Sequence, residues 1–211
     1  MKKLESSFKN MVISLTSISI VLAGLLAFVY MKTKEPIAQA ERQKQESAIR
    51  VVVPEFNNNP TEEKFKVEIA DGDSLTVFPA KQDEKTVGFA IEANTQKGFS
   101  GEIKIMVGFD NDGVIKNFSV LKHAETPGLG AKMQEWFSNT ERPNQNVINR
   151  KWNSDIKVKK DGGEIDAITA ATITSRAFID AFNRAHAAYN KVMETESQEQ
   201  EIADEQNQDL N

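Results

Sequence analysis

The residues best suited to chemistry lie between Asp166 and Ser175, where small residues and hydroxyls crowd a turn just ahead of a predicted helix. The first backbone N–H groups of a helix lack partners, and the helix dipole is positive there, so such a turn favours a phosphate. The commoner role for a hydroxyl at this place is helix capping, here by Thr174 or Ser175. Spacing alone leaves both interpretations open and favours capping.

A second candidate stretch runs from Glu125 to Gly130, between a predicted strand and a predicted helix that contains Met133, Trp136 and Phe137. Its glycines permit close backbone approach and positive φ. The loop could therefore lie against a flat ring, with N–H groups and Thr126 as polar contacts. An ordinary strand-to-helix connection explains the same residues equally well.

The rest of the chain offers little chemistry of its own. It has no cysteine, which excludes zinc-thiolate and iron–sulfur ligation, and its two histidines, His123 and His186, are too far apart to suggest a metal site. It also lacks a Walker loop, a G-x-G-x-x-G fingerprint and a nucleophile elbow. Electron transfer by this chain would therefore require a bound cofactor. His123 is interpreted as structural, and no charge pattern indicates nucleic-acid binding.

The elements that position these stretches follow from hydrophobic periodicity. Apolar residues alternate with polar ones from Phe65 onward, which predicts strands. The segments 102–109 and 114–121, joined by Asp-Asn-Asp-Gly at 110–113, predict a β-hairpin. One more strand is predicted over 152–159. Helical spacing follows residue 174, with apolar positions at Phe178, Ala181, Phe182, Ala185, Tyr189 and Val192.

Composition divides the chain into parts. Residues 10–32 form an apolar run long enough to span a bilayer, after a short segment 1–9. A cleavable signal peptide is the alternative, but the run exceeds the usual signal core, which favours an uncleaved anchor. Residues 33–62 are interpreted as a polar stalk and 63–193 as the folded domain. Residues 194–211 hold seven acidic and no basic residues, which predicts a disordered tail and accounts for the net charge of −5.

With these stretches in view, the chain resembles the FMN-binding domain family, and specifically the G subunits of Rnf ion-translocating electron-transport complexes. The resemblance covers essentially the whole chain. It rests on the apolar N-terminal run, the Gly-Phe-Ser-Gly-Glu-Ile sequence at 98–103, the hairpin turn at 110–113, and the stretches 125–130 and 166–172. It implies an α+β fold: one transmembrane helix, then a domain with a mainly antiparallel sheet and flanking helices.

In that family the stretch corresponding to 166–172 is the recognition site of a flavin transferase, which joins FMN through its phosphate to the last Thr or Ser hydroxyl. The resemblance assigns this acceptor to Thr172, with Thr174 and Ser175 too late in the pattern. Asp166, Thr169 and Ala171 match the recognition pattern. Ala170 departs from it, because the family usually has glycine there, and its methyl group is expected to hinder attachment or oppose a positive φ. Flavin contacts are expected from Glu125, Thr126, Leu129 and Gly130.

The resemblance implies an electron-transfer subunit rather than a stand-alone enzyme. It would carry covalent FMN within a ferredoxin:NAD+ oxidoreductase, beside membrane and iron–sulfur subunits. It also implies a single-pass protein of the inner membrane whose C-terminal domain is periplasmic, although Lys and Arg flank the apolar run on both sides and leave the orientation open. Two alternatives remain: the C subunit of the sodium-pumping NADH:quinone reductase, and an anchored FMN-binding or regulatory module without redox function.

Overall fold

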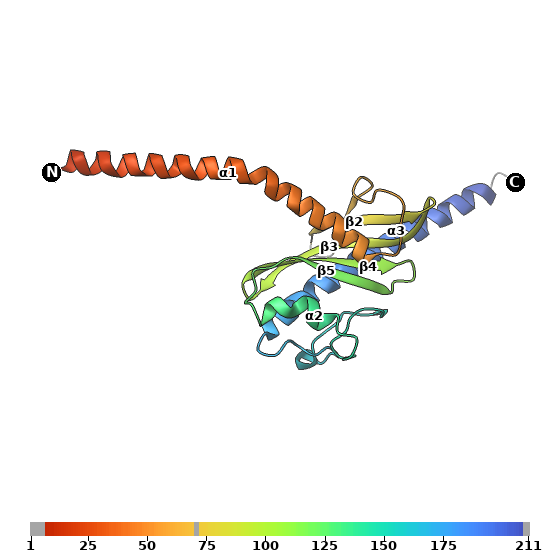
Figure 1. Ribbon diagram of the computed structural model, residues 1–211. Coiled ribbons are helices and arrows are strands. Elements are labelled where there is room, and N and C mark those ends of the chain that lie inside the picture. The colour runs from red at the N-terminus through yellow and green to blue at the C-terminus, as the bar shows by residue number, and fades with distance from the viewer. Residues whose placement is uncertain (1–6, 70–71, 209–211) are drawn as a thin grey trace. The chain divides into compact units, whose positions relative to one another are not determined.

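The computed structural model describes residues 7–69 and 72–208, with side chains to residue 198 (Figure 1). It contains two compact units, Met1–Lys44 and Gln45–Asn211. Helix α1, Phe8–Val52, runs through the first unit and ends within the second. The second unit combines an antiparallel five-stranded sheet with helices, and the fold is therefore of the predicted α+β class.

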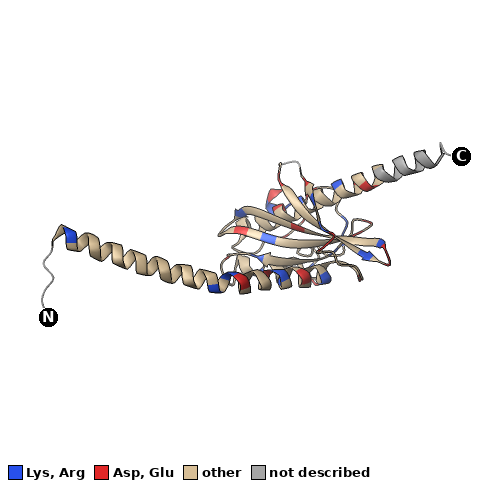
Figure 2. Cartoon of the chain, turned by 90° about the horizontal axis from the view of Figure 1, so that it is seen from above, with Lys and Arg blue, Asp and Glu red and all other residues tan. Residues whose placement is uncertain are grey.

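The described part of the first unit consists almost entirely of α1, and it contains the apolar part of that helix. Figure 2 shows a long stretch of α1 without charged residues. The sequence places this stretch between Lys9 and Lys32, and the side chains of residues 11–31 are exposed. In the part of the chain that the structure describes, α1 is the one helix long and apolar enough to cross a membrane. An exposed apolar surface of this length is costly in water and suited to lipid. The helix continues through Pro36 into the segment predicted as a stalk.

The sheet is a simple meander. Its strands, in spatial and chain order, are β1 (Phe65–Glu68), β2 (Ser74–Gln82), β3 (Lys85–Gly98), β4 (Gly101–Asp110) and β5 (Ile115–Lys122). Every neighbouring pair is antiparallel. The predicted hairpin is confirmed, because β4 and β5 pair through residues such as Val107 and Phe118. The earlier strands also fall where period-two alternation predicts them.

Alternation along the strands buries both faces of the sheet. One face carries Ile91, Ile105 and Val107 into a large core, while Phe78 and Met106 point to a smaller core on the other face. Side chains of successive strand residues point to opposite faces, so one set of strands can serve two apolar layers.

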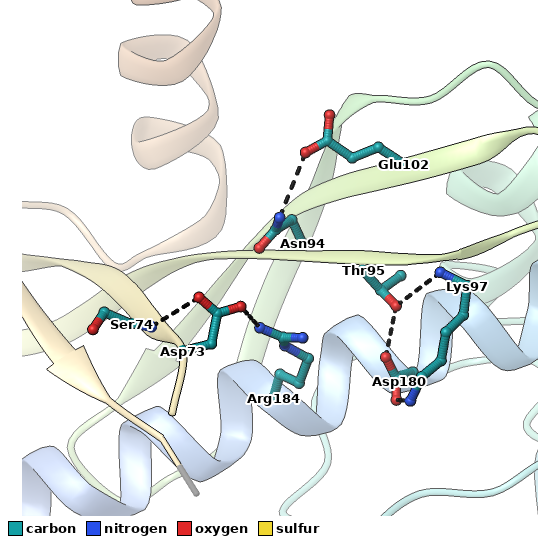
Figure 3. Close-up of polar contacts among 8 residues, drawn as sticks. All are labelled: Asp73, Ser74, Asn94, Thr95, Lys97, Glu102, Asp180 and Arg184. Atoms are coloured by element: carbon teal, nitrogen blue, oxygen red, sulfur yellow. Dashed lines mark hydrogen bonds and ion pairs between the residues drawn. The ribbon is translucent and has the colours of Figure 1, made fainter. Parts of the chain in front are cut away.

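Helix α3 (Thr172–Gln208) covers the first face. Its predicted apolar positions, Phe178 and Phe182 among them, are buried in the large core. Polar contacts fix the helix further (Figure 3): Asp180 accepts hydrogen bonds from Thr95 Oγ1 at 2.7 Å and from Lys97 Nζ at 2.6 Å, and Arg184 pairs with Asp73. The end of β3 and the residue before β2 are thereby tied to α3.

The C-terminal end of α1 covers the second face. Ala48, Ile49 and Val52 are buried against Phe78 and Met106. A side chain at Gly108 would not fit, because a Cβ there would overlap the carbonyl oxygen of Val52. Residues 45–52 therefore belong to the folded domain, not to a stalk.

Two predictions about secondary structure differ from the structure. Residues 152–159 do not form a strand. Val158 makes an isolated bridge to Ile165 and a short 3-10 turn, Lys159–Asp161, follows. Residues 194–208, predicted to be disordered, continue α3 as helix. Glu, Gln and Ala are good helix formers, and neither glycine nor proline follows Gly163, so nothing in the local sequence ends the helix.

Candidate functional site

The two stretches singled out in the sequence meet at one cavity. It has a volume of about 340 Å³, within the range of small-molecule pockets, and three segments line it. The β3–β4 turn contributes Phe99, the loop after β5 contributes Glu125, Thr126, Leu129 and Gly130, and the segment that leads into α3 contributes residues 170–174. The sheet and the polar ties of α3 hold these segments together. The fold itself therefore forms the cavity, by bringing these three segments together.

Three exposed apolar side chains surround the opening. Phe99 is 67% exposed, Ile173 is 51% exposed and Leu129 is 40% exposed. Large apolar side chains cost free energy when they face water, and a cluster of them marks a surface that binds something apolar. A flat aromatic ring suits such a surface.

The floor of the cavity is polar and tightly packed. The Glu125 carboxylate is buried, and it accepts hydrogen bonds from Thr174 Oγ1 at 2.6 Å and from the Ser100 backbone N–H at 3.1 Å. A Cβ at Gly130 would lie 2.6 Å from Thr174 Oγ1 and 2.8 Å from a Glu125 carboxylate oxygen. Glycine is thus required for the loop to approach α3 this closely. Glu125 is held as a structural acceptor that links all three segments.

Among the residues that the structure describes, no side chain caps the start of α3. The helix begins at Thr172, and the Ser175 N–H bonds to the Ala171 carbonyl, which makes alanine the N-cap residue. The Ser175 hydroxyl instead bonds the Ile168 N–H and the Ala171 carbonyl, and the Thr174 hydroxyl goes to Glu125. The capping interpretation is therefore wrong. Within residues 7–69 and 72–208, no side-chain acceptor is recorded for the first N–H groups of α3, and unpaired N–H groups at a helix start suit an anion.

Ala170 has a backbone φ of 61°. The left-handed region is unfavourable for a residue with a Cβ, by about 1–2 kcal/mol. The methyl group therefore does not prevent a positive φ, although it makes this conformation more costly. The turn places the next two residues at the cavity, with Ala171 buried and Thr172 half-buried.

Thr172 lies between two hollows. It lines the first cavity and also a second hollow of about 510 Å³, which Lys159, Lys160, Asp166 and Thr169 line as well. Lys160 Nζ donates a hydrogen bond to Thr172 Oγ1 at 3.2 Å. Asp166 pairs with Lys159 at 2.8 Å, and its carbonyl accepts from Trp136 Nε1.

The structure thus brings most of the predicted site residues together. The first cavity gathers Glu125, Thr126, Leu129, Gly130, Ala171 and Thr172, whereas Asp166 and Thr169 line the second hollow. Sequence reasoning missed Phe99, Ile173 and Lys160. An exposed aromatic residue in the turn Gly98-Phe99-Ser100-Gly101 was a usable signal. His123 Nδ1 accepts from the Glu125 N–H at 3.2 Å, which agrees with its structural interpretation.

Comparison with known families agrees with this geometry. An FMN-binding domain model matches residues 98–187, and an RnfG N-terminal region model matches residues 1–52. The first match contains every residue that lines the 340 Å³ cavity.

Curated relatives extend the match to most of the chain. A protein of Vibrio cholerae serotype O1 (strain M66-2), named as the G subunit of an ion-translocating oxidoreductase complex, is 34% identical over 171 residues, which are 78% of this chain and 82% of the relative. This chain belongs to the family of these G subunits. The relative from Salmonella typhi is 36% identical over 77% of this chain and 81% of its own length, and the one from Aliivibrio fischeri (strain ATCC 700601 / ES114) is 33% identical over 85% and 89%. The cavity and the apolar helix both fall within the matched family regions.

Proposed function

We propose that this chain is the membrane-anchored flavoprotein subunit of an Rnf-type ion-translocating ferredoxin:NAD+ oxidoreductase, with FMN joined covalently to Thr172 by a phosphoester. The observation that carries the proposal is the cavity itself. Thr172, the first residue of α3, lines it together with Phe99, Leu129 and Ile173, which form an apolar rim. One end of such a site suits a phosphate, and the other suits an aromatic ring.

The chain's own residues would hold the cofactor in distinct ways. The first N–H groups of α3 and its dipole would bind the phosphoryl oxygens. The rim would shield one side of the ring system from water, while Glu125 fixes the loop against α3 rather than moving a proton. FMN, when bound, supplies the electron-transfer chemistry that the side chains of this cysteine-free chain lack.

A covalent tether makes retention of the cofactor independent of binding affinity. The cavity can then stay open at its rim, where a partner would exchange electrons with the ring. Other membrane and iron–sulfur subunits would supply and accept these electrons. The relatives, which are named as G subunits of an ion-translocating oxidoreductase complex, favour this complex over the sodium-pumping quinone reductase.

Attachment is tested by producing the chain with and without a flavin transferase. We expect the wild type to gain the mass of FMN less one water, and peptide mapping to locate the adduct on Thr172. Thr172→Ser keeps a hydroxyl and should be modified, whereas Thr172→Ala should carry no flavin. An adduct that survives in Thr172→Ala would contradict the site. A flavin that other subunits of the complex cannot reduce would favour the regulatory alternative.

We further propose that α1 anchors the chain in the inner membrane and that the domain is periplasmic. The exposed apolar stretch of α1 supports the anchor, and the resemblance supports the orientation. A C-terminal reporter that is active only outside the cytoplasm should be active. Activity of a reporter restricted to the cytoplasm would overturn the orientation.

A further inference from the structure

Lys160 is the one charged side chain bonded to the proposed flavin acceptor in the part of the chain that the structure describes. Its Nζ lies 3.2 Å from Thr172 Oγ1. We propose that Lys160 is the charge partner of the phosphoryl group at Thr172, both while the phosphoester forms and after it has formed. This inference rests on the proposed function and adds a residue that the family pattern at 166–172 does not contain.

Lys160 forms no ion pair among the described residues: its charge acts on the neighbouring Asp161 carboxyl, but that carboxyl is paired with Arg176. The preceding residue, Lys159, is already paired with Asp166 at 2.8 Å. Within the described residues, Lys160 has no carboxylate within 4.0 Å, and its one hydrogen bond goes to the threonine hydroxyl. A hydrogen bond between an exposed lysine and a hydroxyl contributes little free energy by itself. A phosphodiester carries a full negative charge, so the same ammonium group would interact with it much more favourably than with the hydroxyl.

The turn that carries Lys160 is itself attached to α3. The next residue, Asp161, accepts two hydrogen bonds from Arg176, at 2.8 Å from Nε and 2.6 Å from Nη2. A bidentate pair of this kind fixes direction as well as distance. The Arg176 guanidinium also holds the pKa of the Asp161 carboxyl below its usual range, so the pair stays charged. The backbone N–H of Lys159 bonds the Ile165 carbonyl at 2.8 Å, which secures the other side of the turn.

The position of Lys160 also assigns a direction to the cofactor. The two hollows share Ala170 and Thr172, but their linings differ. Phe99, Leu129 and Ile173 line the first, whereas Lys159 and Lys160 line the second. The ring would occupy the apolar hollow, and phosphoryl oxygens would face Lys160. Thr172 would sit at the junction, which is where a phosphoester must be.

Attachment has a balanced chemistry in which Lys160 has a defined part. The bond from Thr172 Oγ1 to the FMN phosphorus forms, and the anhydride bond of a flavin dinucleotide donor breaks, with a nucleoside monophosphate leaving. The hydroxyl proton passes to a base of the transferase or to water. Negative charge develops on Oγ1 and on the phosphoryl oxygens, beside the ammonium of Lys160. A positioned cation stabilises such charge in the transition state.

The test measures the rate of FMN attachment, by intact mass, with purified transferase and flavin dinucleotide. Lys160→Gln should lower the initial rate about tenfold, and Lys160→Arg should recover most of it, because Arg keeps the charge and donates to phosphate. The matched control is Lys157→Gln, an exposed lysine in the same segment that makes the same change in net charge. Its rate should stay within about twofold of the wild type.

A second variant tests the attachment of the turn. Asp161→Asn keeps Lys160 but weakens the pair with Arg176, and it should lower the rate by less than Lys160→Gln does. Equal rates in Lys160→Gln and the wild type would overturn the inference, as would equal losses in Lys160→Gln and Lys157→Gln. If the wild type itself gains no flavin while a known substrate of the transferase does, the proposed function fails and the inference fails with it.

Discussion

Ala170 shows how one methyl group can strain a functional turn. Its φ of 61° lies in a region that glycine occupies without steric cost. The family resemblance marks this position as unusual, and the expectation was that the methyl would hinder a positive φ. The chain adopts the positive φ nonetheless, and the Ser175 hydroxyl holds the turn on both sides of Ala170, because it accepts from the Ile168 N–H and donates to the Ala171 carbonyl. The strain is thus held by neighbours that sequence patterns do not reveal.

Ala170→Gly should stabilise the folded protein. Relief of the left-handed strain stabilises by about 1–2 kcal/mol, and the more flexible unfolded chain offsets about 0.4–1 kcal/mol of this, which leaves a net stabilisation of up to about 1.5 kcal/mol. Urea unfolding of the detergent-solubilised chain, followed by tryptophan fluorescence, measures the change. The control is Ala187→Gly on the exposed side of α3, which should destabilise by about 1 kcal/mol. The same sign for both variants would contradict the assignment of strain to Ala170.

The site residues divide by how they are recognised. Thr172 and Gly130 could be expected at the cavity that they line, because the motifs that contain them form a recognisable pattern in the sequence. Lys160 could not, since it reaches Thr172 only through the fold of the turn after Val158. Contacts of this kind depend on tertiary structure. No periodicity or spacing encodes them.

At the scale of the elements, alternation and helical spacing predicted the strands and the buried face of α3 well. Both patterns arise because the side chains that face the core are apolar. The prediction failed over 152–159, where apolar residues such as Ile156 and Val158 are buried in a loop without a strand partner along their length. A short apolar run indicates that its residues are buried. It does not indicate whether a neighbouring strand is present to form backbone hydrogen bonds with it.

The stability of the folded domain should depend on pH through His186, which lies on α3. This side chain is half-buried on α3 near the Phe109 ring, and burial lowers its pKa below the ordinary 6.5, while nearby Asp155 acts in the opposite direction. The unfolded chain therefore binds a proton before the folded one does as pH falls. The contribution to stability is present above about pH 6.5 and is lost as the pH falls through the lowered pKa.

Thermal unfolding between pH 7.5 and 5.5 (roughly one unit on each side of the ordinary histidine pKa) measures this effect. The wild type should lose stability over this interval. His186→Gln cannot titrate, and its midpoint should fall less over the same interval. The carboxylates that also titrate in acid are common to both proteins, so the difference isolates His186. Parallel curves for the two proteins would rule out its contribution.

For the whole molecule, the division between anchor and domain does not coincide with the end of the apolar run or with the end of α1. Composition placed a stalk at residues 33–62 because the segment is polar overall. Yet Ala48, Ile49 and Val52 lie one and three residues apart, the spacing of one helix face, and they cover Phe78 and Met106. The spacing was visible in the sequence. Its partner surface on the sheet was not.

Two truncations should therefore behave differently. A chain that begins at Gln45 lacks the apolar unit and keeps the residues that cover the second face of the sheet. We expect it to be water-soluble, to unfold cooperatively and to accept FMN on Thr172. A chain that begins at Pro54 also loses Ile49, Val52 and Val53. Burial of each of these side chains stabilises by about 1.5–3 kcal/mol, so the longer deletion should cost about 5 kcal/mol or more.

The loss should appear in the shorter chain as a lower urea midpoint and as self-association through the uncovered Phe78 and Met106, measured by light scattering. Adding back a peptide of residues 45–53 should partly restore the midpoint, since the contacts need not be covalent. Equal stability of the two truncated chains would mean that the end of α1 is a stalk after all. The sheet would then tolerate water on that face, contrary to its burial of Phe78, Ala90 and Met106.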